Sequence, residues 1–129
     1  MAEVVTLGEA MVRLSPPHFQ RIEQARSFDV EIGGAELNTA VGLARLGHTV
    51  AWVSVLPANP LGRLIARRVR EAGVEDRWIR FTDEGRCGLY FLEFGAAPRA
   101  SALLYDRKDS AFSRLRPGQL EWERILAGA

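Results

Sequence analysis

The sequence is short of cysteine, of long apolar runs and of net charge, and each shortage excludes a class of protein. Its single cysteine, Cys87, excludes an internal disulfide framework and a zinc site built from cysteines. No apolar run approaches the roughly 20 residues that a membrane-spanning helix needs. The first residues, Glu3 among them, lack the basic start and apolar core of a secretory signal. We therefore expect a cytoplasmic protein with no membrane partner.

The charges nearly cancel, because 17 lysines and arginines stand against 16 aspartates and glutamates, a net charge of +1. This balance argues against a nucleic-acid partner held by bulk electrostatic attraction. One predicted helix has a basic face, for which a solvated surface is the favoured interpretation because no aromatic residues are interleaved. That face is formed by Arg63, Arg67, Arg68 and Arg70. With 47% hydrophobic residues, the chain is typical of one globular domain with a real core.

Short apolar runs alternate with helical patterns over the first 82 residues. An extended apolar run indicates a strand, whereas apolar residues at intervals of three and four indicate a helix. The short connections favour right-handed crossovers and a parallel sheet. We expect strands over residues 4–7, 10–14, 28–32, 48–56 and 78–81, helices over 35–46 and 61–72 that end at Gly47 and Gly73, and a last short helix over 117–126.

Gly33 and Gly34 connect an expected strand to the first helix, and the chain is organised around them. Paired glycines let the backbone approach a ligand closely and adopt positive φ. The helix N-terminus that follows carries partial positive charge. The turn is therefore either a site for a polar or anionic small molecule or a tight turn that needs glycine for steric reasons. Asn38, in the first helical turn, could face a ligand or the backbone.

An antiparallel hairpin is predicted after residue 85. Extended runs cover residues 87–94 and 100–107, and the loop between them contains glycine and proline. If the pairing centres between Ala97 and Pro98, directly opposed residues project to the same side of the hairpin.

This pairing places Tyr90 opposite Tyr105 and Gly88 opposite Arg107. Two phenols, a guanidinium and a glycine that leaves room would then line one surface. Arginine binds a carboxylate with two parallel hydrogen bonds, and tyrosine offers a flat apolar face with a polar tip. Such a surface suits a sugar acid. The alternative is a packed aromatic pair with Arg107 extending to water.

Two expected strands, Val4–Leu7 and Trp52–Val55, have no polar residues to face water. A parallel sheet needs cover on both faces, and only two strong helices and a weak third are available. We therefore expect either that the sheet continues in residues outside this chain or that a partner covers it.

Taken together, these stretches resemble the N-terminal part of the ribokinase-like (PfkB) family of ATP-dependent sugar kinases, and within it the 2-keto-3-deoxygluconate kinases. The resemblance covers nearly all of this chain but under half of a family member. It rests on Gly8-Glu9-Ala10-Met11, Gly33-Gly34-Ala35-Glu36-Leu37-Asn38, Ala44-Arg45-Leu46-Gly47, Leu56-Pro57-Ala58-Asn59-Pro60-Leu61-Gly62 and Tyr105-Asp106-Arg107-Lys108.

The resemblance implies an α/β, ribokinase-like fold: an incomplete parallel sheet with flanking helices and an antiparallel lid hairpin. Residues 1–129 would be the N-terminal portion of that domain, with lid strands over about 10–32 and 86–107 and the C-terminal nucleotide-binding half absent. The family's catalytic aspartate lies in a Gly-Ala-Gly-Asp motif of that half, and no Walker-type phosphate loop is present here. No catalytic or metal-binding residue is therefore assigned, and the isolated chain is expected to be inactive. ATP and Mg²⁺ would serve only the complete enzyme.

The resemblance also assigns a substrate site. It places Gly34, Tyr90, Tyr105 and Arg107 at sugar contacts, with Asn38 as a further one, whereas Glu9, His18 and Lys108 are left as surface or structural residues. Two departures bear on the substrate. Glu36 stands where many sugar kinases have proline. The keto-deoxy-sugar branch is similar to this chain in having glutamate there. Arg13 lies near the position where ribokinases and fructokinases use an aspartate, which favours an acid sugar, although Arg13 could equally be a surface residue.

Two functions remain open at this point. The first is the sugar-binding portion of an ATP-dependent carbohydrate kinase that phosphorylates 2-keto-3-deoxygluconate or a related sugar acid. The second is a non-catalytic sugar-binding or dimerisation module, because lid sheets in this family often pair between subunits. A homodimer is expected in either case.

Overall fold

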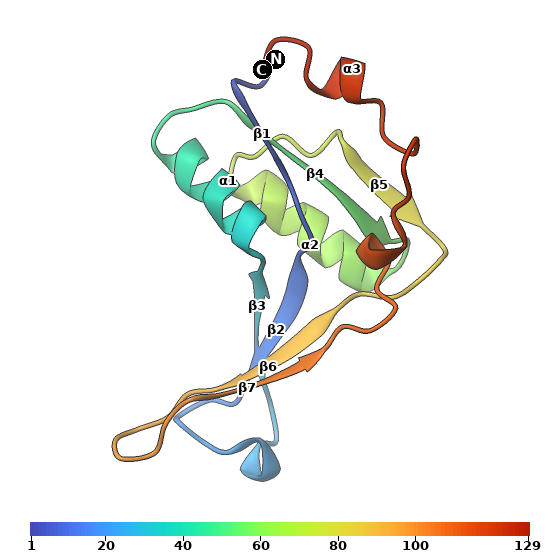
Figure 1. Ribbon diagram of the computed structural model, residues 1–129. Helices are drawn as coiled ribbons and strands as arrows, with labels where there is room; N and C mark the ends of the chain where they lie inside the picture. The colour runs from blue at the N-terminus through green and yellow to red at the C-terminus, as the bar shows by residue number, and fades with distance from the viewer.

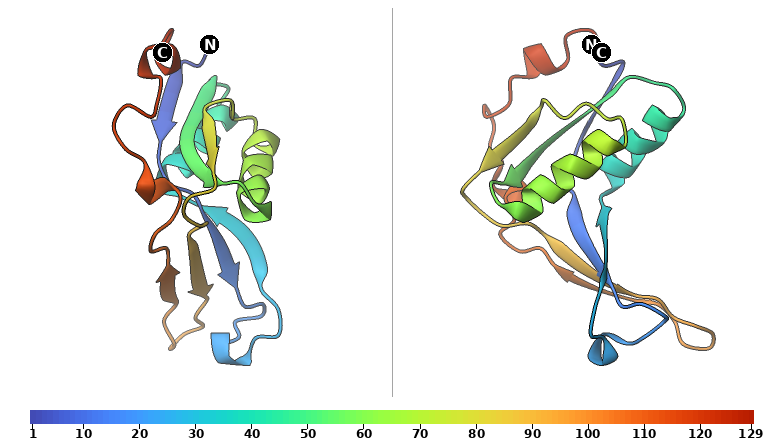
Figure 2. Two further views of the ribbon diagram at one scale, coloured as in Figure 1. Left: turned by 90° about the vertical axis from the view of Figure 1, so that its right-hand side faces the viewer. Right: turned by 180° about the vertical axis from the view of Figure 1, so that it is seen from behind.

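The protein consists of a helix-covered parallel sheet and a second, mixed sheet that projects away from it (Figure 1). The computed structural model describes residues 1–129. The two chain termini lie side by side, at the end of the molecule opposite the projecting sheet (Figure 2). This architecture confirms the predicted α/β class.

The first sheet contains three parallel strands in the order β1-β4-β5. Both of its helices lie on one face (Figure 2). The parallel pairing predicted from the short connections is confirmed for these three strands, whereas the predicted strand over residues 28–32 pairs antiparallel in the second sheet. The outer edges of β1 and β5 are unpaired. The elements of this part are β1 (Val4–Leu7), α1 (Ala35–Arg45), β4 (Val50–Pro57), α2 (Pro60–Glu71) and β5 (Ile79–Thr82).

β4 is the centre of the hydrophobic core, and all eight of its residues are buried. On the side of the helices, Trp52 and Leu56 belong to one packed cluster with Ile65 and Val69 of α2 and Leu37 of α1. Burying a large apolar side chain of this kind stabilises a fold by about 1.5–3 kcal/mol. These contacts hold α1 and α2 against the sheet.

The other face of β4 is covered by residues 110–129, which cross the sheet opposite the helices (Figure 2). Ala111 and Ile125 of this segment are buried. For this face of β4 the chain supplies the cover itself, whereas the expectation that the sheet continues in residues outside this chain, or is covered by a partner, stays a prediction for the unpaired edge of β1. Edge strand β1 is less protected, and its Leu7 is 37% exposed.

The second sheet has the strand order β3-β2-β6-β7. Its strands are β2 (Met11–Ser15), β3 (Asp29–Gly33), β6 (Leu89–Glu93) and β7 (Ala102–Asp106). Each outer pair is antiparallel, as predicted for the hairpin of β6 and β7, but the central pair, β2 and β6, is parallel. Two hairpins that are distant in the sequence thus form one continuous sheet.

Local sequence accounts for the helix boundaries. Gly47 follows α1 with a left-handed φ of 96°, and the N–H of His48 donates to the carbonyl of Leu43 at 3.1 Å. Gly73 ends α2 in the same way, with a φ of 79°. At the start of α2, the side chain of Asn59 accepts hydrogen bonds from two backbone N–H groups, and Pro60 occupies the first helical turn.

The predicted C-terminal helix is shorter than expected. Helix α3 spans only Trp122–Ile125, because Pro117 is followed by Gly118 in a left-handed turn with a φ of 84°. Short 3-10 turns lie at Ile22–Gln24 and Phe112–Arg114. The sequence pattern over residues 117–126 therefore predicted a longer helix than the single turn that forms.

The basic face of α2 is solvated, as predicted. Arg67 pairs with Glu71 at 2.9 Å and Arg70 with Asp76 at 2.8 Å, and all four side chains are at least partly exposed. Surface pairs of this kind contribute up to about 1 kcal/mol each. No helix in the structure has the length and apolar character that crossing a lipid bilayer requires.

Glycines inside the two helices provide a test of this packing. A Cβ on Gly62 would lie 1.9 Å from the carbonyl oxygen of Pro57, whereas a Cβ on Gly42 would meet nothing within 4 Å. We expect Gly62→Ala to lower the free energy of unfolding by about 1–3 kcal/mol. The matched variant Gly42→Ala should raise it by about 0.5–1 kcal/mol. Urea denaturation of both variants measures this, and equal stability would contradict the packing of α2 on the end of β4.

Candidate functional site

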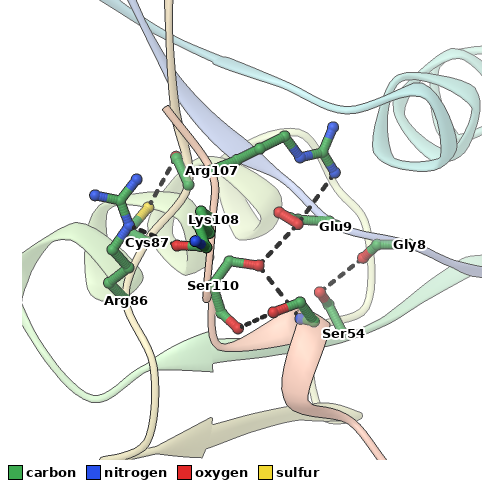
Figure 3. A network of polar contacts seen from close by, with 10 residues as sticks. Gly8, Glu9, Ser54, Arg86, Cys87, Arg107, Lys108 and Ser110 are labelled. Atoms are coloured by element: carbon green, nitrogen blue, oxygen red, sulfur yellow. Dashed lines mark hydrogen bonds and ion pairs between the residues drawn. The ribbon is translucent and has the colours of Figure 1, made fainter. Parts of the chain in front are cut away.

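The connection between β1 and β2 links the two sheets and lies at the centre of the candidate site (Figure 3). It consists of Gly8, Glu9 and Ala10, directly after the carboxyl end of β1. The buried hydroxyl of Ser54 in β4 donates a 2.7 Å hydrogen bond to the carbonyl of Gly8, which fixes the connection to the parallel sheet. Ligands of open α/β sheets usually bind outside the carboxyl ends of the strands.

Two tyrosines form a flat surface beside this connection. Tyr90 and Tyr105 lie opposite each other, as predicted, and their rings stack with centroids 5.8 Å apart and planes 27° from parallel. Gly33 leaves the space that the Tyr90 hydroxyl occupies, because a Cβ there would lie 2.0 Å from that oxygen. Tyr105 is 55% exposed. The pair therefore offers solvent an aromatic surface with polar tips.

Gly34 makes a close contact with backbone. A Cβ at this position would lie 2.5 Å from the carbonyl oxygen of Glu9. Its φ of 166° is extended, and Gly33 is also outside the left-handed region, so the prediction of positive φ at this pair is wrong. Steric need accounts for both glycines, because they let the turn before α1 pack on the tyrosine and on the β1–β2 connection.

A buried carboxylate joins the connection to the second sheet (Figure 3). The side chain of Glu9 is 8% exposed, and its Oε1 accepts hydrogen bonds from Arg107 Nη2 at 3.1 Å and from Ser110 Oγ at 3.0 Å. The side chain of Arg107 is 47% exposed, so it remains partly accessible to solvent. Gly88 stands opposite it, since a Cβ there would lie 3.2 Å from the Arg107 Cβ.

The strand register gathers several of the predicted residues on one face of the second sheet. Arg13 is aligned with Tyr90, which is aligned with Tyr105, so the three form a row across β2, β6 and β7. The guanidinium of Arg13 lies 5.7 Å from the ring centroid of Phe94 and is partly buried. This face carries two arginines and two tyrosines, and the row continues into β3 at Glu31, which is aligned with Arg13.

Asn38 is less closely connected to the other predicted residues. It lies exposed in the first turns of α1, and its backbone N–H donates to the carbonyl of Gly34 at 2.8 Å. No hydrogen bond joins its side chain to Tyr90, Tyr105 or Arg107. The structure thus brings four predicted residues around the β1–β2 connection and leaves Asn38 at its helical margin.

Glu9 is the residue that sequence reasoning missed. The only signal in the sequence was a carboxylate directly after Gly8 at the end of an apolar strand. At such a position the sequence pattern does not distinguish a buried carboxylate from an exposed one. Cys87, close by, is a buried free thiol, and burial raises its pKa. A raised pKa keeps the thiol protonated and unreactive at neutral pH.

The chain shows no group of three or more histidine, cysteine, aspartate or glutamate side chains placed to hold a metal ion. A cavity of about 310 Å³ lies elsewhere, and its walls include Val55, Arg80 and Arg114. The candidate site is instead an open face, because Tyr105 and Arg107 are about half exposed.

Comparison with known proteins places this geometry in context. A model of the pfkB family of carbohydrate kinases matches residues 1–125. The 2-dehydro-3-deoxygalactonokinase of Haloferax volcanii is 49% identical over 119 residues, which cover 92% of this chain and 37% of that protein. The crystal structure of 2-dehydro-3-deoxygluconokinase from Thermotoga maritima matches with a TM-score of 0.96 and 47% identity, over 100% of this chain and 39% of that one.

A sugar kinase of Pyrococcus horikoshii, solved in complex with ATP, shares the fold with a TM-score of 0.84 and 23% identity, over 95% of this chain and 39% of that one. The chain therefore spans less than two-fifths of the length of each of these proteins.

Alanine substitutions at Gly33 and Gly34 are expected to have different effects, one on the geometry of the tyrosine pair and the other on the stability of the fold. Gly33→Ala collides with the end of the Tyr90 side chain, which can swing away, whereas Gly34→Ala collides with the backbone of Glu9. We expect Gly33→Ala to change the free energy of unfolding by less than about 1 kcal/mol while it unstacks the two tyrosine rings. Gly34→Ala should cost about 1–3 kcal/mol. Urea denaturation and the NMR signals of the rings measure both, and unchanged ring signals in Gly33→Ala would contradict the geometry.

Proposed function

This chain belongs to the pfkB family of carbohydrate kinases, and from that membership we propose that it is the sugar-binding portion of a kinase that phosphorylates 2-keto-3-deoxygluconate or a related sugar acid. Two of the similar proteins named above, those of Haloferax volcanii and Thermotoga maritima, are named as kinases of 2-dehydro-3-deoxy sugar acids, the systematic name for the same class. The whole activity belongs to a longer protein, since the chain covers 37–39% of those relatives.

The observation that carries the proposal is Arg107 beside the stacked pair of Tyr90 and Tyr105. A half-exposed guanidinium has donors available for a carboxylate, and such charge-assisted bonds are about twice as strong as neutral ones. The tyrosine rings flank the carbon chain and direct their hydroxyls to its oxygens. Gly34 and Asn38, at the positively polarised start of α1, contact the remaining hydroxyls.

The chemistry of the candidate substrates matches this assignment of the carboxylate to Arg107 and of the hydroxyls to other residues. The galactonate and gluconate derivatives differ in the configuration of one hydroxyl, whereas the carboxylate and the neighbouring carbonyl are common to both. Arg107 recognises the common end of the molecule. The choice between the two acids then falls to residues that contact the variable hydroxyl.

ATP and Mg²⁺ belong to the complete enzyme in this proposal. Kinases of this kind use ATP as the phosphoryl donor, and one similar sugar kinase is solved with ATP. No group of three or more histidine, cysteine, aspartate or glutamate side chains is placed to hold a metal ion in this chain, and we assign Mg²⁺ to the nucleotide-binding half of the complete enzyme. In this proposal the chain binds and orients the sugar acid, and the complete enzyme works in the cytoplasm. The chain is inactive alone, because positioning of the phosphates supplies most of the catalysis.

A second role, self-association through the second sheet, is favoured by β7. This edge strand has an unpaired side, and its central residues are apolar and exposed: Leu103 at 55%, Leu104 at 56% and Tyr105 at 55%. Exposed apolar edge strands readily pair with another chain. A homodimer formed in this way is compatible with sugar binding by each copy.

Ligand titration of the 129-residue chain, followed by NMR, tests the substrate class. We expect 2-keto-3-deoxygluconate to bind with a dissociation constant of about 1 mM, or −4 kcal/mol, and neutral fructose to bind more weakly. Arg107→Gln removes the charge but still lets an amide donate to Glu9, and it should weaken binding of the acid about tenfold. The matched control Arg63→Gln, on the exposed face of α2, should have no effect. Equal responses to the acid and to fructose would refute the assignment of Arg107.

Sedimentation of the same chain tests the second role. We expect a dimer at about 10–100 µM protein, and Leu104→Asp should produce monomers, because a charge on the exposed edge opposes pairing. Leu46→Asp is the control, since Leu46 is 78% exposed at the end of α1 and far from β7. A wild-type monomer throughout this range, or an equal effect of both substitutions, would exclude association through β7.

A further inference from the structure

Glu9 is unusual among the acidic residues of this chain. Its side chain is 8% exposed, its Oε1 accepts two hydrogen bonds, and its Oε2 is buried without a partner. Gly88 allows this placement, because a Cβ there would lie 3.2 Å from Oε2. A carboxylate is rarely held in such surroundings unless the groups that it binds require it.

We propose that Glu9 is the positioning residue of the site: it holds the guanidinium of Arg107 toward the tyrosine surface and sets its charge. The inference rests on the proposed function, since it concerns the same sugar-acid surface. It extends that function, because Glu9 touches no ligand and acts through Arg107.

The geometry supports a positioning role in two ways. Glu9 engages one terminal nitrogen, Nη2, and so leaves the other donors of Arg107 free for a carboxylate. Ser110 donates to the same oxygen, which fixes the carboxylate from the chain segment that follows β7. The pair therefore connects the end of β7 to the connection after β1, over 98 residues of sequence.

Glu9 also compensates charge. Without it, Arg107 would present a full positive charge to any small anion. With it, the pair is neutral, so a ligand must add contacts to the tyrosines to bind well. Orientation of Arg107 by Glu9 raises the affinity for the sugar acid, whereas compensation of its charge lowers that affinity. Two substitutions of Glu9 separate these effects.

The first test compares two arginines in the wild-type chain. Arg63 has no ion pair or side-chain hydrogen bond and is exposed, which makes it an internal reference. The guanidinium N–H groups of Arg107 should exchange with water about three- to tenfold more slowly than those of Arg63, the effect of one hydrogen bond. Glu9→Ala should remove this difference. Equal exchange in the wild-type protein overturns the proposal, whether or not the variant folds.

The second test measures affinity for 2-keto-3-deoxygluconate in Glu9→Gln and Glu9→Ala. Both variants lack the charge, but only glutamine can still accept a hydrogen bond from Arg107. We expect Glu9→Gln to bind about two- to fivefold more tightly than the wild type, through lost charge compensation. Glu9→Ala should bind about three- to tenfold more weakly than Glu9→Gln, through lost orientation.

Glu71→Gln is the control, since it breaks an exposed 2.9 Å pair with Arg67 and should change neither result. A merely structural Glu9 would give the two variants equal affinity, and that result overturns the proposal. If Glu9→Ala fails to fold, the exchange of Arg107 and the affinity of Glu9→Gln relative to wild type decide. Slow exchange at Arg107 without any binding of the acid supports the positioning role and refutes the proposed function.

Discussion

Close packing of three chain segments at the carboxyl end of β1 is the constraint on which this structure depends. A Cβ on Gly8 would lie 2.2 Å from the carboxylate of Glu36, and one on Gly34 would lie 2.5 Å from the carbonyl of Glu9. At Gly33 the same atom would reach the Tyr90 hydroxyl. Gly34 is required because it faces backbone, whereas Gly8 and Gly33 leave room for the ends of side chains, and none of the three has a left-handed φ. The tight junction holds the projecting sheet in a fixed relation to the parallel sheet.

The polar groups of this junction follow from its burial. A carboxylate removed from water costs several kcal/mol unless it is paired and hydrogen-bonded. Glu9 meets this requirement at Oε1, which accepts from Arg107 and Ser110 near the far end of the chain, whereas its Oε2 is buried without a partner. Because the arginine is half exposed, solvent screens the pair, and its contribution to stability is smaller than that of a fully buried pair. The pair therefore matters more for the direction of the guanidinium than for the stability of the fold.

The two sheets divide the work of the molecule. The parallel sheet, with β4 buried on both faces, is a rigid base that depends on apolar packing. The projecting sheet has little core of its own, and its last strand is exposed along its whole length. A surface that binds a polar ligand or another subunit must keep its side chains accessible in this way. The stability of the fold must then come mainly from the apolar core of the parallel sheet.

The sequence by itself determined the elements and one half of the site. Strands and helices follow from local periodicity and from stop signals such as Gly47, and the pairing of Tyr90 with Tyr105 follows from the symmetry of a single hairpin. Tertiary structure alone decided the parallel pairing of β2 with β6, the cover of β4 by residues 110–129, and the contact of Glu9 with Arg107. Each of these joins segments far apart in the chain, and whether a residue such as Glu9 is buried depends on what packs against it. Local pattern carries no information about that contact.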